Sequence, residues 1–271
     1  MDAFQAIVLG IVQGLTEFLP ISSSGHLRIV PAFAGWEDPG AAFTAVIQLG
    51  TMAAVLLYFR RDLWNIARGW VAGLRDPSVR GTLDSRMGWY LIAGTVPIVI
   101  FGVAFSGPIE DEARNLTLIG STLIVLGLVL LLAERVARRE REVEDVGPRD
   151  ALVIGFAQAA ALVPGVSRSG ATITAGLFLG FDRAAAARFS FLLSVPAVVL
   201  SGLYELRDIG GEGAVGFVPT ALATLFAFVS GYASIAFLLR FLVTHTTAVF
   251  VVYRVVLGVV VLALVGADVI D

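Results

Sequence analysis

The fold is decided by residues 5–34, which read QAIVLGIVQGLTEFLPISSSGHLRIVPAFA. The stretch begins with an apolar run, Gln5–Leu19, which stops at Pro20. A helix needs about 20 apolar residues to cross the hydrocarbon core of a bilayer, so this run is too short. A Ser/Gly loop and a second short apolar stretch, Leu27–Ala34, follow it. This layout predicts a re-entrant hairpin, which enters the membrane and turns back.

A second stretch with the same layout lies in the other half of the chain. Its apolar run Ala151–Val163 ends at Pro164, and a Ser/Gly loop separates it from Ala171–Leu179. Ordered polar matches at one constant offset are hard to obtain by chance in so apolar a chain. The pairs at an offset of 145 residues include Gln13 with Gln158, Ser22 with Ser167, Ser24 with Ser169 and Gly25 with Gly170.

The rest of the chain is dominated by long apolar runs. Of its 271 residues, 57% are hydrophobic and 15% charged, with a mean hydropathy of +0.86. Soluble domains are about 45–50% apolar and about 25% charged, so these values indicate a membrane protein. We expect an all-α integral membrane fold with six transmembrane helices plus two re-entrant helical hairpins in an inverted repeat. The six predicted spans are Ala41–Phe59, Trp89–Phe105, Leu116–Ala133, Ala184–Tyr204, Pro219–Leu239 and Thr247–Val265.

One hairpin and three spans in each half predict that the second half is inverted relative to the first. We therefore expect a single membrane domain of two inverted repeats, about residues 1–134 and 150–271, joined by a polar cytoplasmic linker, 135–149. Segments 60–88 and 135–150 are rich in Arg, which places them in the cytoplasm. Both termini and the mouth of the first hairpin then face outward. We interpret the charged stretch 134–150 as a solvated loop with no further role.

The first loop gathers groups that suit catalysis. Gln13 and Glu17 are four residues apart and so share one helix face. An ionisable group such as Glu17 inside an apolar segment is a functional hypothesis by default. Ser22–Ser24 and Gly25 offer an N-cap for the next helix and hydroxyls for attack or phosphate binding. His26 beside them suits acid–base chemistry, and a purely structural role for it is the alternative.

The second loop suits an anion. Gly165 and Gly170 permit a tight backbone, and Ser167 and Ser169 add hydroxyls at the start of the following helix. Arg168 offers a planar fork that matches a phosphate. An Arg inside the membrane needs an anionic partner, for which Glu17 and a bound phosphate are the two candidates. Arg254, in the last span, is a weaker candidate of the same kind, and a purely structural bridge between Arg168 and Glu17 is the alternative.

Meeting near the midplane, the two loops would form one cavity for an anionic head group whose tail stays in lipid. A phosphorylated lipid fits this description, and a hydroxyl beside an imidazole suggests phosphoryl transfer. The rival class is a secondary transporter or lipid flippase, because inverted repeats with paired hairpins are a transporter architecture. A transporter has no need of a nucleophile–base pair, and a structural scaffold does not explain the buried ionisable groups.

These motifs resemble the undecaprenyl-diphosphate phosphatase family of the bacitracin-resistance type. The resemblance rests on Gln13-x-x-x-Glu17, Pro20-Ile-Ser-Ser-Ser-Gly-His26 and Pro164-Gly-Val-Ser-Arg-Ser-Gly170, and it covers essentially the whole chain. It implies hydrolysis of a polyprenyl diphosphate to the monophosphate and inorganic phosphate, which recycles the carrier lipid for cell-wall glycan synthesis. It also implies a plasma-membrane protein with an outward-facing site and a divalent cation, Mg²⁺ or Ca²⁺. We expect no nucleic acid partner, and the sequence leaves a homodimer open.

By position, the resemblance makes Glu17 the essential carboxylate and a cation ligand. It makes Ser23 the nucleophile, His26 the catalytic histidine that helps it, and Arg168 the phosphate-binding residue. An imidazole nucleophile at His26 is the alternative. Gln13 stands where many family members have a second Glu, which weakens a cation-binding role there. The expected substrate-binding residues are Gln13, Ser22, Ser24, Gly25, Gly165, Ser167, Ser169 and Gly170.

Overall fold

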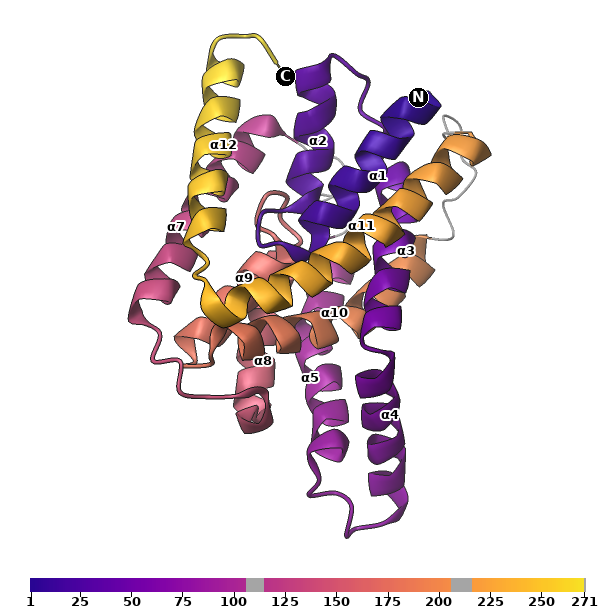
Figure 1. The fold of residues 1–271 in the computed structure, drawn as a ribbon, viewed down its shortest axis with the longest axis vertical. Coiled ribbons are helices and arrows are strands. Elements are labelled where there is room, and N and C mark those ends of the chain that lie inside the picture. The colour runs from indigo at the N-terminus through magenta and orange to yellow at the C-terminus, as the bar shows by residue number, and fades with distance from the viewer. Residues whose placement is uncertain (106–114, 206–215, 271) are drawn as a thin grey trace.

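The computed structural model describes residues 1–105, 115–205 and 216–270, which are almost entirely helical. Figure 1 shows the helices gathered into one bundle. Across this part of the chain there are no extended strands, in agreement with the expected all-α fold. The α-helices are α1 (Ala3–Phe18), α2 (Ser23–Ala34), α3 (Gly40–Tyr58), α4 (Arg60–Arg75), α5 (Leu83–Ala104), α7 (Leu116–Val136), α8 (Pro148–Ala160), α9 (Arg168–Phe178), α10 (Arg183–Glu205), α11 (Phe217–Thr244) and α12 (Ala248–Gly266).

Both predicted hairpins are present as pairs of short helices. α1 ends just before Pro20, which cannot continue a helix. After the polar loop, Ser22 caps α2, its side chain accepting a bond from the backbone N–H of Gly25. In the second hairpin α8 ends before Pro164, and Ser167 caps α9 in the same way. The expectation that a serine of the first loop would cap the next half-helix is confirmed, and Ser167 does the same in the second loop.

The predicted spans are also helical, with ends that differ by a few residues. Among the described residues, five helices are long and apolar enough to cross a membrane, namely α5, α7, α10, α11 and α12. The sixth predicted span is α3, which meets α4 at a bend of 73°. α10 is the central helix, because 67% of its apolar window is buried, against 28–39% in the other four.

Matching glycines of the two halves bring each hairpin onto a span of the other half. At Gly10 in α1, an added Cβ would lie 2.3 Å from the carbonyl oxygen of Ala223 in α11. At Gly155 in α8, it would lie 2.4 Å from the carbonyl oxygen of Gly94 in α5. Only a residue without a side chain permits such backbone contact. The first-half hairpin therefore packs on a second-half span, and the second-half hairpin on a first-half span.

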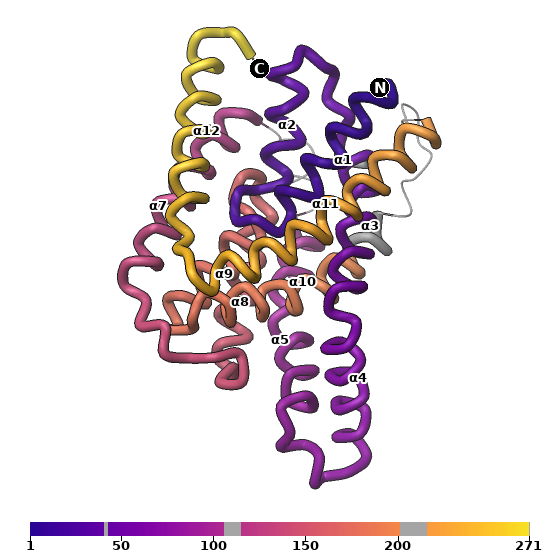
Figure 2. Tube along the Cα trace, in the orientation of Figure 1, coloured from indigo at the N-terminus to yellow at the C-terminus, as the bar shows by residue number. Residues whose placement is uncertain are grey.

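The termini and the long polar connections lie at opposite ends of the bundle. Figures 1 and 2 show the N- and C-termini together at one end and the turn between α4 and α5 at the other. The sequence treated 60–88 as a connecting segment, whereas residues 60–75 form α4, a helix that packs along α5. Its Trp64 is 68% exposed, so α4 carries an apolar side chain outside the core. The division into two inverted repeats and its boundaries stay a prediction.

The stretch 134–150 is not merely a solvated loop, which corrects the expectation for it. Glu134 is buried at the end of α7, where its carboxylate pairs with Arg183 of α10 and accepts a hydrogen bond from the Thr247 hydroxyl (2.8 Å). Asp150 is buried in the first turn of α8 and pairs with Arg141 at 2.6 Å. Buried carboxylates need such partners, and these pairs fasten the connection to three helices. Sequence order alone did not reveal the partners.

Candidate active site

Glu17 is the point where the two hairpins meet. One carboxylate oxygen, Oε1, pairs with the guanidinium of Arg168 at the start of α9. The other, Oε2, accepts hydrogen bonds from the Ser23 hydroxyl at 2.5 Å and from the Gln13 side chain at 3.2 Å. Close by, the hydroxyl of Ser169 donates to the Leu19 carbonyl at 2.9 Å. A carboxylate, a hydroxyl and a cation thus share one site inside the helical bundle.

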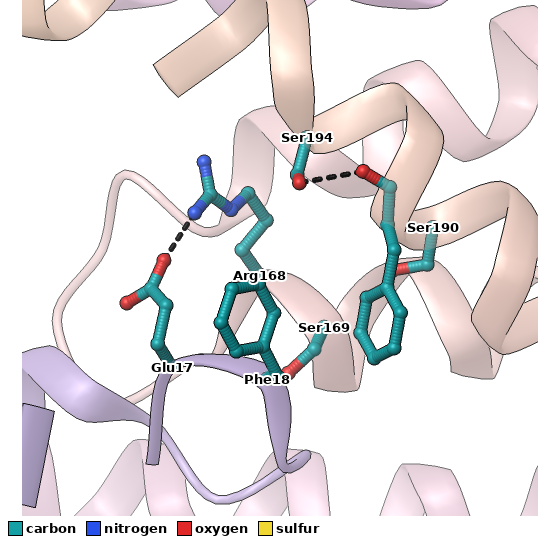
Figure 3. Close-up of a pocket in the computed structure, with 7 residues that line it drawn as sticks. Glu17, Phe18, Arg168, Ser169, Ser190 and Ser194 are labelled. Atoms are coloured by element: carbon teal, nitrogen blue, oxygen red, sulfur yellow. Dashed lines mark hydrogen bonds and ion pairs between the residues drawn. The ribbon is translucent and has the colours of Figure 1, made fainter. Parts of the chain in front are cut away.

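A small pocket opens beside this cluster. Figure 3 shows Glu17 and Arg168 facing each other on one side and Ser194 and Ser190 of α10 on the other. The pocket therefore has a charged wall from the two hairpins and a hydroxyl-bearing wall from the central helix. Its lining residues are Glu17, Phe18, Arg168, Ser169, Ser190, Phe191 and Ser194.

The polypeptide is bent unusually at both caps. Ser22 has φ 75° and Ser167 has φ 72°, in a region that residues with a side chain rarely adopt. Such strain persists only where the surroundings enforce it, and it is common at functional sites. Here it turns the chain from loop to helix abruptly, which lets Ser23 and Arg168 lie at the helix starts and reach Glu17.

Arg254 forms hydrogen bonds with the backbone of both loops. Its side chain is fully buried in α12 and donates to the carbonyl oxygens of Pro20 (3.2 Å), Gly165 (3.0 Å) and Val166 (3.1 Å). Two further bonds reach carbonyls at positions 122 and 123 of α7. The sequence suggested an anionic partner for Arg254. Its hydrogen bonds instead all go to main-chain carbonyls, so it acts as a clamp on the loops.

A family model described as "Bacitracin resistance protein BacA" matches residues 6–260, which cover both polar loops and reach into the last of the six predicted spans. The chain belongs to this family. It is also 56% identical, over all of its length and 99% of the relative's, to a protein of Nocardioides sp. named "Undecaprenyl-diphosphatase". A Thermobifida fusca protein of the same name is 53% identical over 98% of this chain and 91% of its own. A Chlorobium phaeobacteroides protein, again of that name, is 54% identical over 98% of each.

Apart from His26, the predicted site residues fall into two groups. In the first group, Glu17, Arg168 and Ser169 line the pocket, and Gln13 and Ser23 contact Glu17. The second group shapes the loops instead. Ser22 and Ser167 are the helix caps, and Ser24 is exposed and shares a hydrogen bond with Ser22. Gly165 has φ +85°, Gly25 leaves room for the side chain of Ile119, and Gly170 leaves room for that of Arg254.

His26 lies apart from Glu17. The ring is 5% exposed, with Nδ1 2.6 Å from the Ser22 carbonyl oxygen and Nε2 2.7 Å from the hydroxyl of Tyr253 in α12. Both nitrogens are therefore engaged, and the hydrogen-bond partner of the Ser23 hydroxyl is Glu17. The arrangement differs from the predicted pairing of Ser23 with His26.

Three residues near the site were missed by sequence reasoning. Ser190 and Ser194 lie four residues apart, which puts two hydroxyls on one face of an apolar span, and that spacing was a usable signal. Ser190 shares a 2.5 Å hydrogen bond with Thr172 of α9. Tyr253 gave no signal of its own, although it precedes the conspicuous Arg254.

The donor set suits a hard cation in part. Within the described residues there is no cluster of three or more His, Asp or Glu side chains. The carboxylate of Glu17 is present, however, and the Oε1 atom of Gln13 is buried with no hydrogen-bond partner among these residues. Mg²⁺ is commonly held by one or two such oxygens, water and substrate phosphates. The residues thus fit a cation that arrives with, or is completed by, a diphosphate.

Proposed function

We propose that this protein is a membrane phosphatase that hydrolyses undecaprenyl diphosphate, or a closely similar polyprenyl diphosphate, to the monophosphate and inorganic phosphate. One observation carries the proposal: Glu17 contacts both a hydroxyl that can attack phosphorus and an Arg that can bind phosphate oxygens. The three relatives, which this chain matches over most of their length, are named for the same activity. The product would re-enter the carrier-lipid cycle of cell-wall synthesis.

Arg168 is the binding group for the terminal phosphate. Its guanidinium carries several N–H donors in one plane, a geometry that matches phosphate oxygens in pairs. Ser169 and the two α10 serines, 190 and 194, line the same pocket. The prenyl tail is long and apolar, whereas this pocket is small and lined mainly by polar side chains, so the tail lies between the helices and the lipid.

Ser23 is the nucleophile in the proposed reaction. Its Oγ attacks the terminal phosphorus, the bond from phosphorus to the bridging oxygen breaks, and the polyprenyl monophosphate leaves. Glu17 Oε2, 2.5 Å away, takes the hydroxyl proton, while Oε1 stays paired with Arg168. Water then attacks the phosphoserine, which restores Ser23 and releases inorganic phosphate. His26 is less suited to attack, because both of its nitrogens are engaged.

A divalent cation, Mg²⁺ or Ca²⁺, would be held by Glu17 and Gln13 together with diphosphate oxygens. When bound, it would neutralise the charge that develops on the phosphate oxygens during transfer. A neutral Gln13 makes the protein's own share of the site weak, so the substrate's oxygens contribute the larger part.

We place the protein in the plasma membrane, with the pocket reached from the outer face. The support is the Arg-rich character of segments 60–88 and 135–150, which lie at the end of the bundle away from the termini. Labelling of single cysteines, introduced into this cysteine-free chain near Asp2 and near Arg149, tests the orientation in intact cells. A membrane-impermeant reagent should label only the first.

The secondary transporter or flippase alternative is not favoured. A transporter needs an anion site, which Arg168 supplies, but it does not need Ser23 hydrogen-bonded to a carboxylate. Phosphate release by the purified protein in detergent, where no gradient exists, separates the two functions.

The test uses the full chain in detergent with undecaprenyl diphosphate and measures phosphate release. Glu17→Gln keeps the shape of the side chain but removes its proton-accepting charge, so kcat should fall about a hundredfold. Glu37→Gln, at an exposed carboxylate in the α2–α3 connection, is the matched control and should stay near wild type. No release by the wild-type protein would refute the function. Activity of Glu17→Gln within twofold of wild type would refute the role of Glu17.

A further inference from the structure

Tyr253 contacts His26 from the other end of the chain. Tyr253 lies in the first half of α12 and His26 in the first turn of α2, 227 residues away. The rings stack with an interplanar angle of 8° and centroids 5.6 Å apart. The Tyr253 hydroxyl lies 2.7 Å from Nε2 of the imidazole. Stacking and a hydrogen bond together fix both the plane and the rotation of the His26 ring.

The hydrogen bonds determine the tautomer of neutral His26. The partner of Nδ1 is the carbonyl oxygen of Ser22, which can only accept, so Nδ1 carries the proton. Nε2 of the neutral ring is then an acceptor, and the Tyr253 hydroxyl donates to it. The Ser22 carbonyl is itself held in place, since Ser22 is the cap of α2 with a constrained backbone.

The contact joins a buried residue to a partly exposed one. His26 is 5% exposed and Tyr253 is 43% exposed. Arg254, the next residue, anchors this part of α12 to both loops through its bonds to Pro20 and Gly165. The tyrosine is therefore held at a fixed distance from the loop that carries Ser23.

We infer that Tyr253 is a positioning residue for the phosphatase reaction: it holds His26 in one orientation, with Nδ1 protonated and Nε2 accepting. His26 in turn holds the carbonyl of Ser22, the residue next to the nucleophile Ser23. The inference rests on the proposed function for its kinetic part only. Tyr253 does not line the pocket around Arg168, so it acts through His26 and not on the phosphate. Removing its hydroxyl should therefore slow turnover and leave substrate binding nearly unchanged.

Tyr253→Phe removes the hydroxyl and keeps the ring that packs on His26. Loss of this hydrogen bond should lower kcat about tenfold, with KM within about twofold of wild type. The matched control is Tyr232→Phe in α11, whose ring packs edge-on against Tyr58, and it should keep full activity. If Tyr253 acts through His26, then Tyr253→Phe should cause no further loss in a His26→Gln background. Equal activity of the two tyrosine variants, or additive losses with His26→Gln, would overturn the inference.

A readout without turnover keeps this result separate from the proposed function. With ¹⁵N-labelled histidine and His245→Gln, only the His26 ring gives histidine resonances. Nδ1 should be the protonated nitrogen, and Tyr253→Phe should shift the Nε2 resonance while Nδ1 stays protonated. A protonated Nε2 in the neutral wild-type ring, or no shift in the variant, would overturn the positioning role. If the spectra agree but wild type releases no phosphate, the contact stands and the proposed function fails.

Discussion

Replacing Arg254 by Met tests whether the clamp behind the two loops holds the site together. Arg254→Met keeps most of the side-chain volume but removes all five hydrogen bonds to carbonyl oxygens. The carbonyls of Thr122 and Leu123 lie in α7 and keep their place in that helix. Those of Pro20, Gly165 and Val166 lie in loops and lose a charged donor.

The expected loss follows from these three loop carbonyls. A buried polar group left unpaired costs about 1–3 kcal/mol, which gives about 3–9 kcal/mol for three. Removing a fully buried charge recovers part of this, because the guanidinium no longer has to be desolvated. We therefore expect a net loss of about 3 kcal/mol in the free energy of unfolding. For a chain of this size that corresponds to a fall in Tm of about 6–12 °C.

Thermal unfolding in detergent, followed by tryptophan fluorescence, measures the change. Arg240→Met, at an exposed arginine of α11, is the matched control and should move Tm by no more than about 2 °C. Hydrogen exchange should also increase at residues 19–22 and 163–167, where the clamped carbonyls lie. A Tm of Arg254→Met equal to that of the control, with unchanged exchange in both loops, would refute the clamp.

Three further predictions concern packing, the polar connection and the cation. Gly155→Ala should lower the free energy of unfolding by about 2 kcal/mol, because its Cβ would lie 2.4 Å from a carbonyl oxygen of α5. Gly102→Ala is the control: the atom nearest to its added Cβ would be 3.8 Å away, so this change should be neutral or slightly stabilising. If both variants change the free energy of unfolding equally, in urea or on heating, the close contact at Gly155 is contradicted. Glu134→Gln should lower the free energy of unfolding by about 3 kcal/mol, because it breaks a buried ion pair, whereas Glu140→Gln at an exposed position should leave it unchanged. The same unfolding measurement tests this, and equal values for the two variants would contradict it. Removal of divalent cations with a chelator should abolish phosphate release, and added Mg²⁺ should restore it. Gln13→Ala should raise the Mg²⁺ concentration that gives half-maximal rate about tenfold. Full activity in excess chelator would exclude a cation role.

The hairpins and their meeting point were predictable because they depend on local sequence. Pro20 stops a helix, Ser22 caps the next one, and the same pattern recurs around Ser167, so sequence order alone gave the breaks. The pairing of Glu17 with Arg168 was foreseeable as well, since two opposite charges inside an apolar chain need each other. These features are determined by the properties of a few residues that are close together in the sequence or carry opposite charges.

The contacts that fix the exact geometry were not predictable. The bond from Tyr253 to His26 and the five bonds of Arg254 join segments far apart in sequence. Nothing local distinguishes such partners from the many other polar groups along the spans. Glu134 was misjudged for the same reason, because its burial depends on α10 and α12 packing over the end of α7. Hydrogen-bond partners of this kind need three-dimensional information.

The exchange of hairpins between halves limits how the molecule can move. α1 touches α11 backbone to backbone at Gly10, and α8 touches α5 in the same manner at Gly155. Rocking one half against the other, as carriers do, would pull both of these junctions apart at once. Each half, synthesised alone, lacks the span on which the first helix of its own hairpin mainly packs. The two halves are therefore interlocked, and a chain cut in the 135–149 connection should regain its shape only when both pieces are made together.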